Sequence, residues 1–288
     1  MRKIIALLAA AVLLSGAALA QNRPQINNGD FETWTFDGVN LPNYFNSFQT
    51  ADGTWSGTAY SSSNRQVQRS SDTRPGSTGS FSCSIWSRKV WGVNAQGNLT
   101  TGRVHAGGTS ATSNKNYNYS DRDGSNTRNG FTNPCAMPFT GRPDSLVVWV
   151  KFVPNGTDSK HPYAKVTATI HDDFDYIDGY ENTSPQSHVV ATAINMTIAR
   201  TDSWKRLSIP FRYTNNGAQP RYILLSAATN AYPGGGNEND YLYLDDITLV
   251  YNQSHTLGIP SQGWASLCLD FPAAVPADAK VYIVTGLV

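Results

Sequence analysis

The chain has 288 residues, with 22 Lys or Arg against 21 Asp or Glu, so its formal net charge is only +1. Charged residues make up 15% of the sequence, and Asn, Ser, Thr, Gly and Tyr supply the other polar groups. This balance argues against nucleic acid and against an anionic membrane surface, which both reward a concentrated basic face. Such a composition suits neutral polar ligands such as sugars, although many extracellular β-proteins share it.

Residues 1–20 have the pattern of a secretory signal peptide. Two basic residues precede an apolar run at residues 4–14, and Ala18-Leu19-Ala20 is a small-x-small cleavage sequence. The apolar run is too short for a membrane-spanning helix, so we expect no membrane insertion. We expect export to the periplasm, the cell surface or the medium, with Gln21 as the first mature residue.

After residue 20, short β-branched and aromatic runs alternate with Gly, Asn, Asp, Ser and Pro, and helical periodicity is nearly absent. Such a pattern is typical of strands joined by turns. The clearest predicted strands cover residues 81–86, 145–153, 164–170, 189–198, 205–213, 221–228 and 241–251. Strands at this spacing without helices between them predict an all-β fold, a jelly-roll β-sandwich of two antiparallel sheets over residues 21–252.

The sequence between Trp91 and Pro134 is long and polar. We expect long loops there around one or two strands. Loops over a rigid sheet are where binding residues usually lie.

Residues 253–288 form a separate part, a linker followed by a short β segment. Strand patterns at residues 264–271 and 281–284 flank a turn. Two strands cannot bury a core by themselves. Either they pack on the preceding domain, or they begin a second β-domain that is cut short, and we favour the second alternative.

Three cysteines stand in a chain that we expect to be exported. Cys83 and Cys135 lie in the main domain and are candidates for a disulfide. Cys268 would then be unpaired. The alternative is that all three are buried thiols.

Catalytic motifs are absent or weak in the sequence. It contains no Gly-x-Ser-x-Gly elbow, and its five histidines have no metal-ligand spacing. A glycosidase needs two facing carboxylates. The acids clustered at residues 172–181 are better interpreted as solvated loop residues.

Aromatic residues in the loops are the stronger indication of a ligand site. The apolar faces of sugar rings stack on Trp and Tyr, while sugar hydroxyls bond to polar side chains. The candidates are Trp55, Trp91, Tyr117, Tyr119, Tyr176, Tyr180 and Tyr232. Each has ordinary loop packing as its alternative. We assign Trp34, Trp149 and Trp204 to the core.

A family resemblance rests on residues 131–252. The segments that carry it are residues 137–146, 149–152, 204–213, 220–223 and 242–251. The chain resembles the putative carbohydrate metabolism domain of Bacteroidetes outer-surface and secreted proteins. The resemblance implies a β-jelly roll similar to carbohydrate-binding modules, and it implies no catalytic residues. It covers about half the chain well.

The resemblance to carbohydrate-binding jelly rolls also implies a structural Ca²⁺ ion. In many of them an opening Asn-Gly-x-Phe-Glu lies beside a closing Asp-Asp strand, as in residues 28–32 and 244–247 here. Calcium takes about six to eight oxygen ligands. We therefore expect Glu32, with Asp245 or Asp246, to bind calcium. The alternative is that one carboxylate caps a turn and the other faces water.

We therefore predict an exported, non-catalytic glycan-binding module whose partner is carbohydrate. One alternative is a surface structural or adhesin module that binds no sugar, and a less favoured one is a glycan hydrolase or lyase. A concave face lined by aromatic residues favours the first function. A featureless convex sandwich favours the second, and two inward carboxylates in a cleft favour the third.

Overall fold

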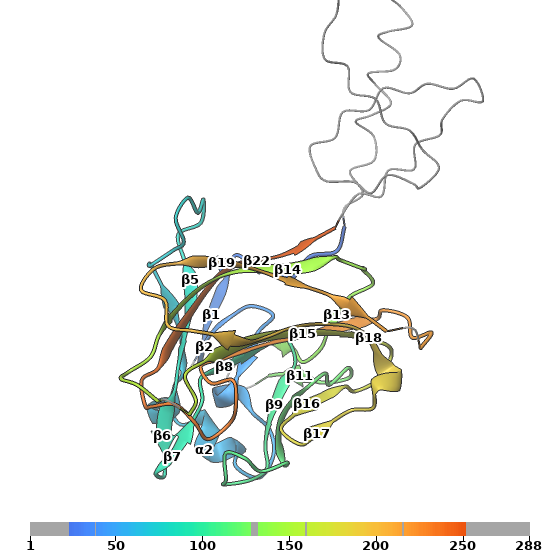
Figure 1. The fold of residues 1–288 in the computed structure, drawn as a ribbon. Helices are drawn as coiled ribbons and strands as arrows, with labels where there is room; N and C mark the ends of the chain where they lie inside the picture. The colour runs from blue at the N-terminus through green and yellow to red at the C-terminus, as the bar shows by residue number, and fades with distance from the viewer. Residues whose placement is uncertain (1–22, 38, 128–131, 159, 215, 252–288) are drawn as a thin grey trace, which may run out of the picture. The chain divides into compact units, whose positions relative to one another are not determined.

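The computed structural model describes residues 23–251 except 38, 128–131, 159 and 215. The predicted signal peptide, the segment 253–288 and Cys268 lie outside the described residues. Within them the chain forms a β-sandwich of two antiparallel sheets, with smaller sheets beside these two layers (Figure 1).

The two main sheets contain most of the long strands. The seven-stranded sheet has the order β20-β18-β15-β21-β8-β3, with β13 beside β21. Its strands are β3 (Asn46–Ser47), β8 (Asn98–Thr100), β13 (Met137–Pro138), β15 (Ala164–His171), β18 (Val189–Ile198), β20 (Arg212–Tyr213) and β21 (Tyr222–Ala228). The five-stranded sheet has the order β19-β14-β22-β5-β4. Its strands are β4 (Val67–Ser70), β5 (Ser82–Trp86), β14 (Ser145–Val153), β19 (Lys205–Pro210) and β22 (Tyr241–Val250).

The remaining elements are short. A four-stranded sheet consists of β9 (Arg103–Ala106), β10 (Asn116–Tyr119), β16 (Ile177–Gly179) and β17 (Asn182–Thr183). Three pairs are β1 (Trp34–Asp37) with β2 (Val39–Pro42), β6 (Arg88–Val90) with β7 (Val93–Ala95), and β11 (Ser125–Asn126) with β12 (Asn133–Pro134). The helical elements are α2 (Ser56–Tyr60) and the 3-10 turns Phe48–Thr50, Ser62–Asn64 and Gln186–His188.

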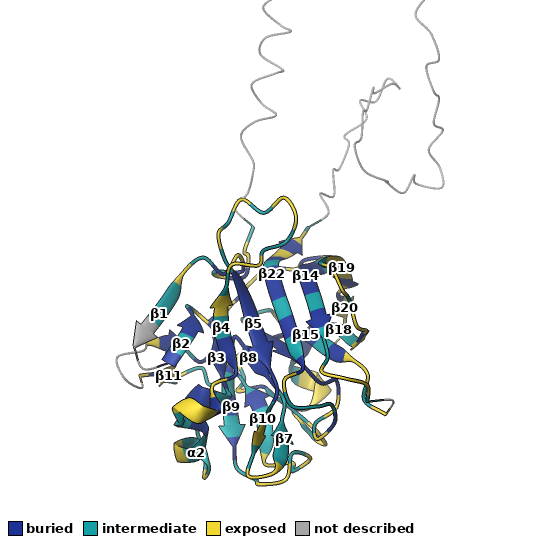
Figure 2. Cartoon of the chain, turned by 90° about the vertical axis from the view of Figure 1, so that its left-hand side faces the viewer, coloured by how far each residue is buried: buried dark blue, intermediate teal, exposed yellow. Residues whose placement is uncertain are grey.

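The core lies between the two main sheets, where alternate side chains meet. In β14 the side chains of Val148, Val150 and Phe152 are buried, and in β15 Val166 and Ala168 are. Figure 2 shows that β5 is buried along its length, whereas buried and more exposed residues alternate along much of β22. This alternation is what a strand with one core face requires. It leaves the intervening residues of each strand on the outer faces of the sandwich.

All seven predicted strands are present, with one change. The predicted strand 205–213 divides at Phe211 between β19 in one sheet and β20 in the other. Pro210 has no N–H for a ladder, and the Phe211 N–H bonds instead to the carbonyl of Asp144. The described residues between 91 and 134 form six strands, more than expected.

The beginning of the described chain lies against the last strand. The Ile247 N–H donates to the Gly29 carbonyl, and a Cβ at Gly29 would come within 2.3 Å of the Ile247 oxygen. Only glycine permits this close approach. The Gln25 side chain both donates to the Leu249 carbonyl at 2.9 Å and accepts from the Leu249 N–H at 2.7 Å. These contacts confirm the expected meeting of the opening segment and the closing strand.

Two tryptophans assigned to the core lie elsewhere. Trp149 and Trp204 are half-buried on the outer face of the five-stranded sheet, because their positions alternate with the core-facing ones. The guanidinium of Arg74 lies 5.5 Å from the Trp149 ring centroid, and the Lys151 ammonium lies 5.8 Å from that of Trp204. Trp34 is partly buried and does pack against the core.

The predicted disulfide between Cys83 and Cys135 is not formed, and both are free, buried thiols. Cys83 faces the core from β5, whereas the backbone of Cys135 bonds to Gly124 and Asp121 in a loop outside that core. Burial raises the pKa of both thiols, that of Cys135 to about 11. The alternative of buried thiols therefore holds for these two residues.

Candidate functional site

A pocket of about 550 Å³ lies on the outer face of the seven-stranded sheet. Its floor is formed by β8, β15 and β18, and its walls by β9, β10, β16, the β6–β7 hairpin and the turn after Ala231. Thr167 and Ile194 pair across β15 and β18 and point into it, because their neighbours Ala168 and Ala193 face the core. Ile194 is 57% exposed, which gives the floor an apolar patch.

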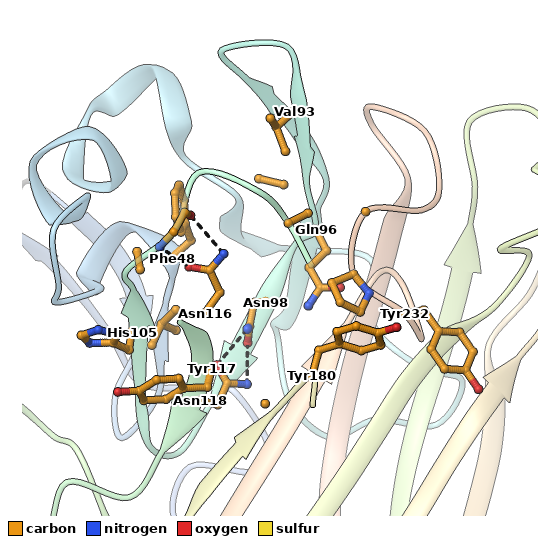
Figure 3. A pocket seen from close by; sticks show the side chains of 18 of the residues that line it. Phe48, Val93, Gln96, Asn98, His105, Asn116, Tyr117, Asn118, Tyr180 and Tyr232 are labelled. Atoms are coloured by element: carbon orange, nitrogen blue, oxygen red, sulfur yellow. Dashed lines mark hydrogen bonds between the residues drawn. The ribbon is translucent and has the colours of Figure 1, made fainter. Parts of the chain in front are cut away.

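Five of the seven predicted aromatic residues line this pocket. They are Trp55, Trp91, Tyr117, Tyr180 and Tyr232. Figure 3 shows Tyr117 on one side and Tyr180 with Tyr232 on the other, with two asparagines between them. Segments that are distant in sequence thus bring several aromatic residues to one space of the size of a small-ligand site.

Tyr119 and Tyr176 do not line the pocket. Tyr119 lies beside Tyr117, with ring centroids 5.6 Å apart, and its hydroxyl donates to Asp52 at 2.8 Å. Tyr176 is only 3% exposed and stacks on His171 at 5.4 Å. Its assignment as a sugar platform was wrong, since its ring packs inside the protein.

Trp91 is held in solvent by a tight hairpin. β6 and β7 pair at Val90 and Val93, and the two residues between them, Trp91 and Gly92, have φ of 49° and 81°. Two positive φ values are the signature of a type I′ turn, which is costly for a bulky residue. The indole is 68% exposed and meets Trp55 edge-on at 5.1 Å. The turn therefore presents a large apolar ring at the pocket mouth.

Amide side chains make the centre of the pocket polar and rigid. Asn98 donates to the side-chain oxygen of Asn118 at 2.9 Å (Figure 3). Asn118 in turn donates to the Ser226 hydroxyl at 3.0 Å. Asn116 accepts from the backbone N–H groups of Gly107 and Gly108. Paired amides keep fixed positions, which suits them to recognise hydroxyl groups.

Two carboxylates fix the backbone of the pocket rim that carries Tyr232 by hydrogen bonds. Burial alone would raise the pKa of Asp158, but three backbone N–H groups, including that of Gly236, donate to it and lower the pKa overall. Asp240 accepts from the N–H groups of Asn155 and Asn237, although burial still raises its pKa. The rim of the pocket is thus ordered without a ligand.

Carboxylates are scarce in the pocket. Asp178 is the only acidic residue among its described lining residues. A glycosidase of the usual kind needs two carboxyl groups that flank the scissile bond. Sequence reasoning also missed a histidine on the wall, His105, whose ring stacks on Tyr117 with centroids 4.7 Å apart.

The residues predicted to hold calcium are each bonded to protein donors. Asp245 is fully buried and accepts from the N–H groups of Arg74 and Asp246, while Asp246 forms an ion pair with the Arg74 side chain. Glu32 accepts from the N–H of Phe81 at 2.8 Å. Among the described residues, no group of three or more His, Cys, Asp or Glu is arranged to hold a metal.

This arrangement does not fit calcium as it stands, since Arg74 supplies the positive charge at Asp246. The Asp-Asp pair has a structural cause of its own. The register of β14 against β22 shifts between Val147 and Trp149, and Asp246 has a φ of 44°. Asp246 and Ile247 therefore lie opposite Val148 in a β-bulge, so the Asp-Asp pair interrupts the apolar strand where its ladder is irregular. Calcium at Glu32, Asp245 and Asp246 stays a prediction.

Fold and pocket together define a β-sandwich protein with a preformed, aromatic-lined pocket on one outer face. None of its described helices is long and apolar enough to cross a membrane. No known family model matches the chain, and no curated protein matches it significantly. Sequence comparison therefore does not confirm the predicted family resemblance.

A solved structure shares the fold, and others are less similar. A putative glycoside hydrolase from Bacteroides thetaiotaomicron is 14% identical, with 78% of this chain and 71% of that chain covered and a TM-score of 0.54. One from Bacteroides vulgatus is 16% identical, with coverages of 80% and 95% and a TM-score of 0.48. The family 11 carbohydrate-binding module of a Clostridium thermocellum cellulase is 10% identical, with coverages of 66% and 82% and a TM-score of 0.32. At these identities the likeness concerns the fold alone.

Proposed function

We propose that this protein is an exported glycan-binding module that holds an oligosaccharide in the pocket of the seven-stranded sheet. The observation that carries the proposal is the gathering of Trp55, Trp91, Tyr117, Tyr180 and Tyr232 around one pocket with a polar centre. Rings at the two sides can stack on sugar faces, and the asparagines between them can bond to hydroxyls. The similar solved structures, two of them described as putative glycoside hydrolases and one as a carbohydrate-binding module, are compatible with this role.

Binding without hydrolysis is the better-supported form of this function. The described lining residues offer one carboxylate, Asp178, where hydrolysis by the usual mechanism needs two. A purely structural module is also disfavoured, because such a role gives no reason to hold Trp91 in solvent through a costly turn.

The test is a glycan array with the purified protein, followed by calorimetry with the soluble oligosaccharides that it retains. Trp91→Ala and Tyr180→Ala should each weaken binding about tenfold, the equivalent of a stacking contact of about 1.4 kcal/mol. Tyr213→Ala is the matched control, since Tyr213 is 39% exposed against 38% for Tyr180 and lies outside the pocket. No retention on the array, or equal losses in all three variants, would contradict the proposal.

A further inference from the structure

Lys165 is the only Lys or Arg among the described residues that line the pocket. It lies on β15 of the pocket floor, where its neighbours Ala164 and Val166 face the core. Side chains alternate between the two faces of a strand, so the Lys165 side chain lies on the pocket face together with that of Thr167. The floor of the pocket therefore carries one positive charge.

The surroundings of Lys165 on the floor are apolar. The register of β15 against β18 shifts between Ala164 and Val166, so Lys165 lies opposite two residues of β18 instead of one. One of the two, Met196, lines the pocket, as does the exposed Ile194 on the same strand. Lys165 is itself partly buried. Its aliphatic part can lie along this apolar floor while the ammonium group reaches into the pocket.

No described acidic side chain forms an ion pair with Lys165. Other basic residues, such as Arg74 and Lys151, are paired with aspartates, but none of the ion pairs among the described residues includes Lys165. Asp178, the one acidic residue of the lining, takes part in none of them either. Two opposite charges thus line one pocket without pairing with each other. Each is left to interact with a ligand.

The positive charge supplies an interaction that the amides of the pocket do not. Asn98 and Asn118 offer donors and acceptors, which suit the hydroxyl groups of any neutral sugar. An ammonium group only donates, and its bonds to an anionic oxygen are roughly twice as strong as bonds between neutral groups. The carboxylate of Asp178 accepts bonds from hydroxyl groups and repels an anion. The described lining therefore has separate groups for an anion and for hydroxyls.

We infer that the ligand of this pocket is an acidic glycan, whose anionic group pairs with the ammonium group of Lys165 while Asp178 accepts hydroxyl donors. This inference rests on the proposed function and names the substrate class of the same site. The anionic group is the carboxylate of a uronic acid or a sulfate ester, because both present charged acceptor oxygens to a donor. Since Asp178 repels anions, the two charges together also set the orientation of the acidic sugar.

A glycan array tests the substrate class directly. It should hold oligouronates and sulfated oligosaccharides beside neutral glycans, and the acidic glycans should be retained best. Calorimetry with the wild-type protein then compares the best-retained acidic glycan with its neutral counterpart. Carboxyl reduction gives that counterpart for a uronate and desulfation gives it for a sulfate ester, so the comparison also identifies the anion. The acidic form should bind about tenfold to a hundredfold more tightly, as one charge-assisted hydrogen bond predicts.

Substitutions then assign the preference to Lys165. Lys165→Met keeps most of the length of the side chain and removes its charge. It should bind the acidic glycan about tenfold more weakly or worse, and the neutral counterpart within about twofold of the wild type. Lys165→Arg should keep the preference for the acidic form. Lys205→Met is the matched control, because Lys205 lies on β19 of the other main sheet, outside the pocket, and this variant should bind both glycans like the wild type.

The outcomes distinguish this inference from the proposed function. Retention of glycans with equal affinity for the acidic and neutral forms overturns the inference and leaves glycan binding intact. So does an acidic glycan whose affinity is the same for Lys165→Met and the wild type. Absence of retention for every glycan overturns the proposed function, and with it the acidic substrate class.

Discussion

The buried imidazole of His171 should make the fold sensitive to acid. His171 is fully buried at the end of β15, between the rings of Tyr176 at 5.4 Å and Tyr222 at 5.6 Å. Its Nδ1 donates to the carbonyl of Asp172 at 2.9 Å, and its Nε2 lies 2.8 Å from the Ser120 hydroxyl. Burial, which outweighs the opposing bond to Asp172, lowers the pKa of His171 from 6.5 to about 4.

The sign of the effect follows from proton linkage. Between pH 6.5 and about 4 the unfolded chain takes up a proton at this position that the folded protein refuses. The contribution of His171 to stability is therefore complete above the unfolded pKa and is lost as the pH falls toward 4. A difference of 2.5 between the two pKa values corresponds to about 3 kcal/mol at most. Between pH 7 and pH 4.5, about 2 to 2.5 kcal/mol of this should disappear.

The assay is urea unfolding at pH 7 and pH 4.5 of the wild type and of His171→Gln, which has no titrating group at this position. The variant will be less stable at both pH values, because it loses the ring contacts. The informative quantity is the difference between the two pH values, which should be smaller in the variant by about 2 kcal/mol. Equal pH dependence of the two proteins would refute the reasoning, as would a His171 imidazole that titrates near pH 6.5 in NMR spectra of the folded protein.

Two further predictions concern the closing strand. Burial raises the pKa of Asp245 from 3.8 to about 6. Its contribution to stability is therefore present below pH 3.8 and is lost as the pH rises toward 6, opposite in sign to that of His171. In urea unfolding with EDTA present, Asp245→Asn should remove this loss, and an unchanged pH profile of the variant would count against the prediction. If calcium binds at Glu32, Asp245 and Asp246, adding Ca²⁺ after EDTA treatment should raise the Tm, and Glu32→Ala should abolish that rise. A Tm that calcium does not change would leave Arg74 as the counter-ion of Asp246.

Long strands were predictable from the sequence because their burial is visible in it. In β14 the residues from Leu146 to Val153 are apolar except Lys151, in β22 Leu242, Leu244, Ile247 and Leu249 mark the core face, and the turns between strands are marked by Gly, Pro and Asn. The short strands of the pocket wall carry no such pattern. β8 and β10 contain Asn98 and Asn118, which are buried because their amides pair with each other across 20 residues of sequence. A periodicity argument cannot find a strand whose contacts are polar.

The same reason limited the prediction of the site. Exposed aromatic residues in loops are conspicuous, and five of seven candidates do meet in one pocket. The Asp52–His105 contact joins residues 53 positions apart through a single parallel bridge, and the Arg74–Asp246 pair spans 172 positions. Neither contact can be recognised from the local sequence pattern. Tyr176 was misassigned because the sequence does not show that its ring packs back onto His171, the last residue of β15.

Aromatic residues on a sheet are not by themselves evidence of a ligand site, as the two outer faces of this sandwich show. On the five-stranded sheet, the Lys151 ammonium lies 4.5 Å from the centroid of Tyr243 and also near Trp204, and Arg74 covers Trp149. The faces of those rings already contact cationic side chains, and these cation–ring contacts hold neighbouring segments against the sheet. On the seven-stranded sheet, the small sheet and the β6–β7 hairpin stand up as walls, so that Trp91 and the rings facing it enclose a space that the protein itself does not fill. It is the walled cavity, rather than the number of aromatic residues, that places the candidate site on this face.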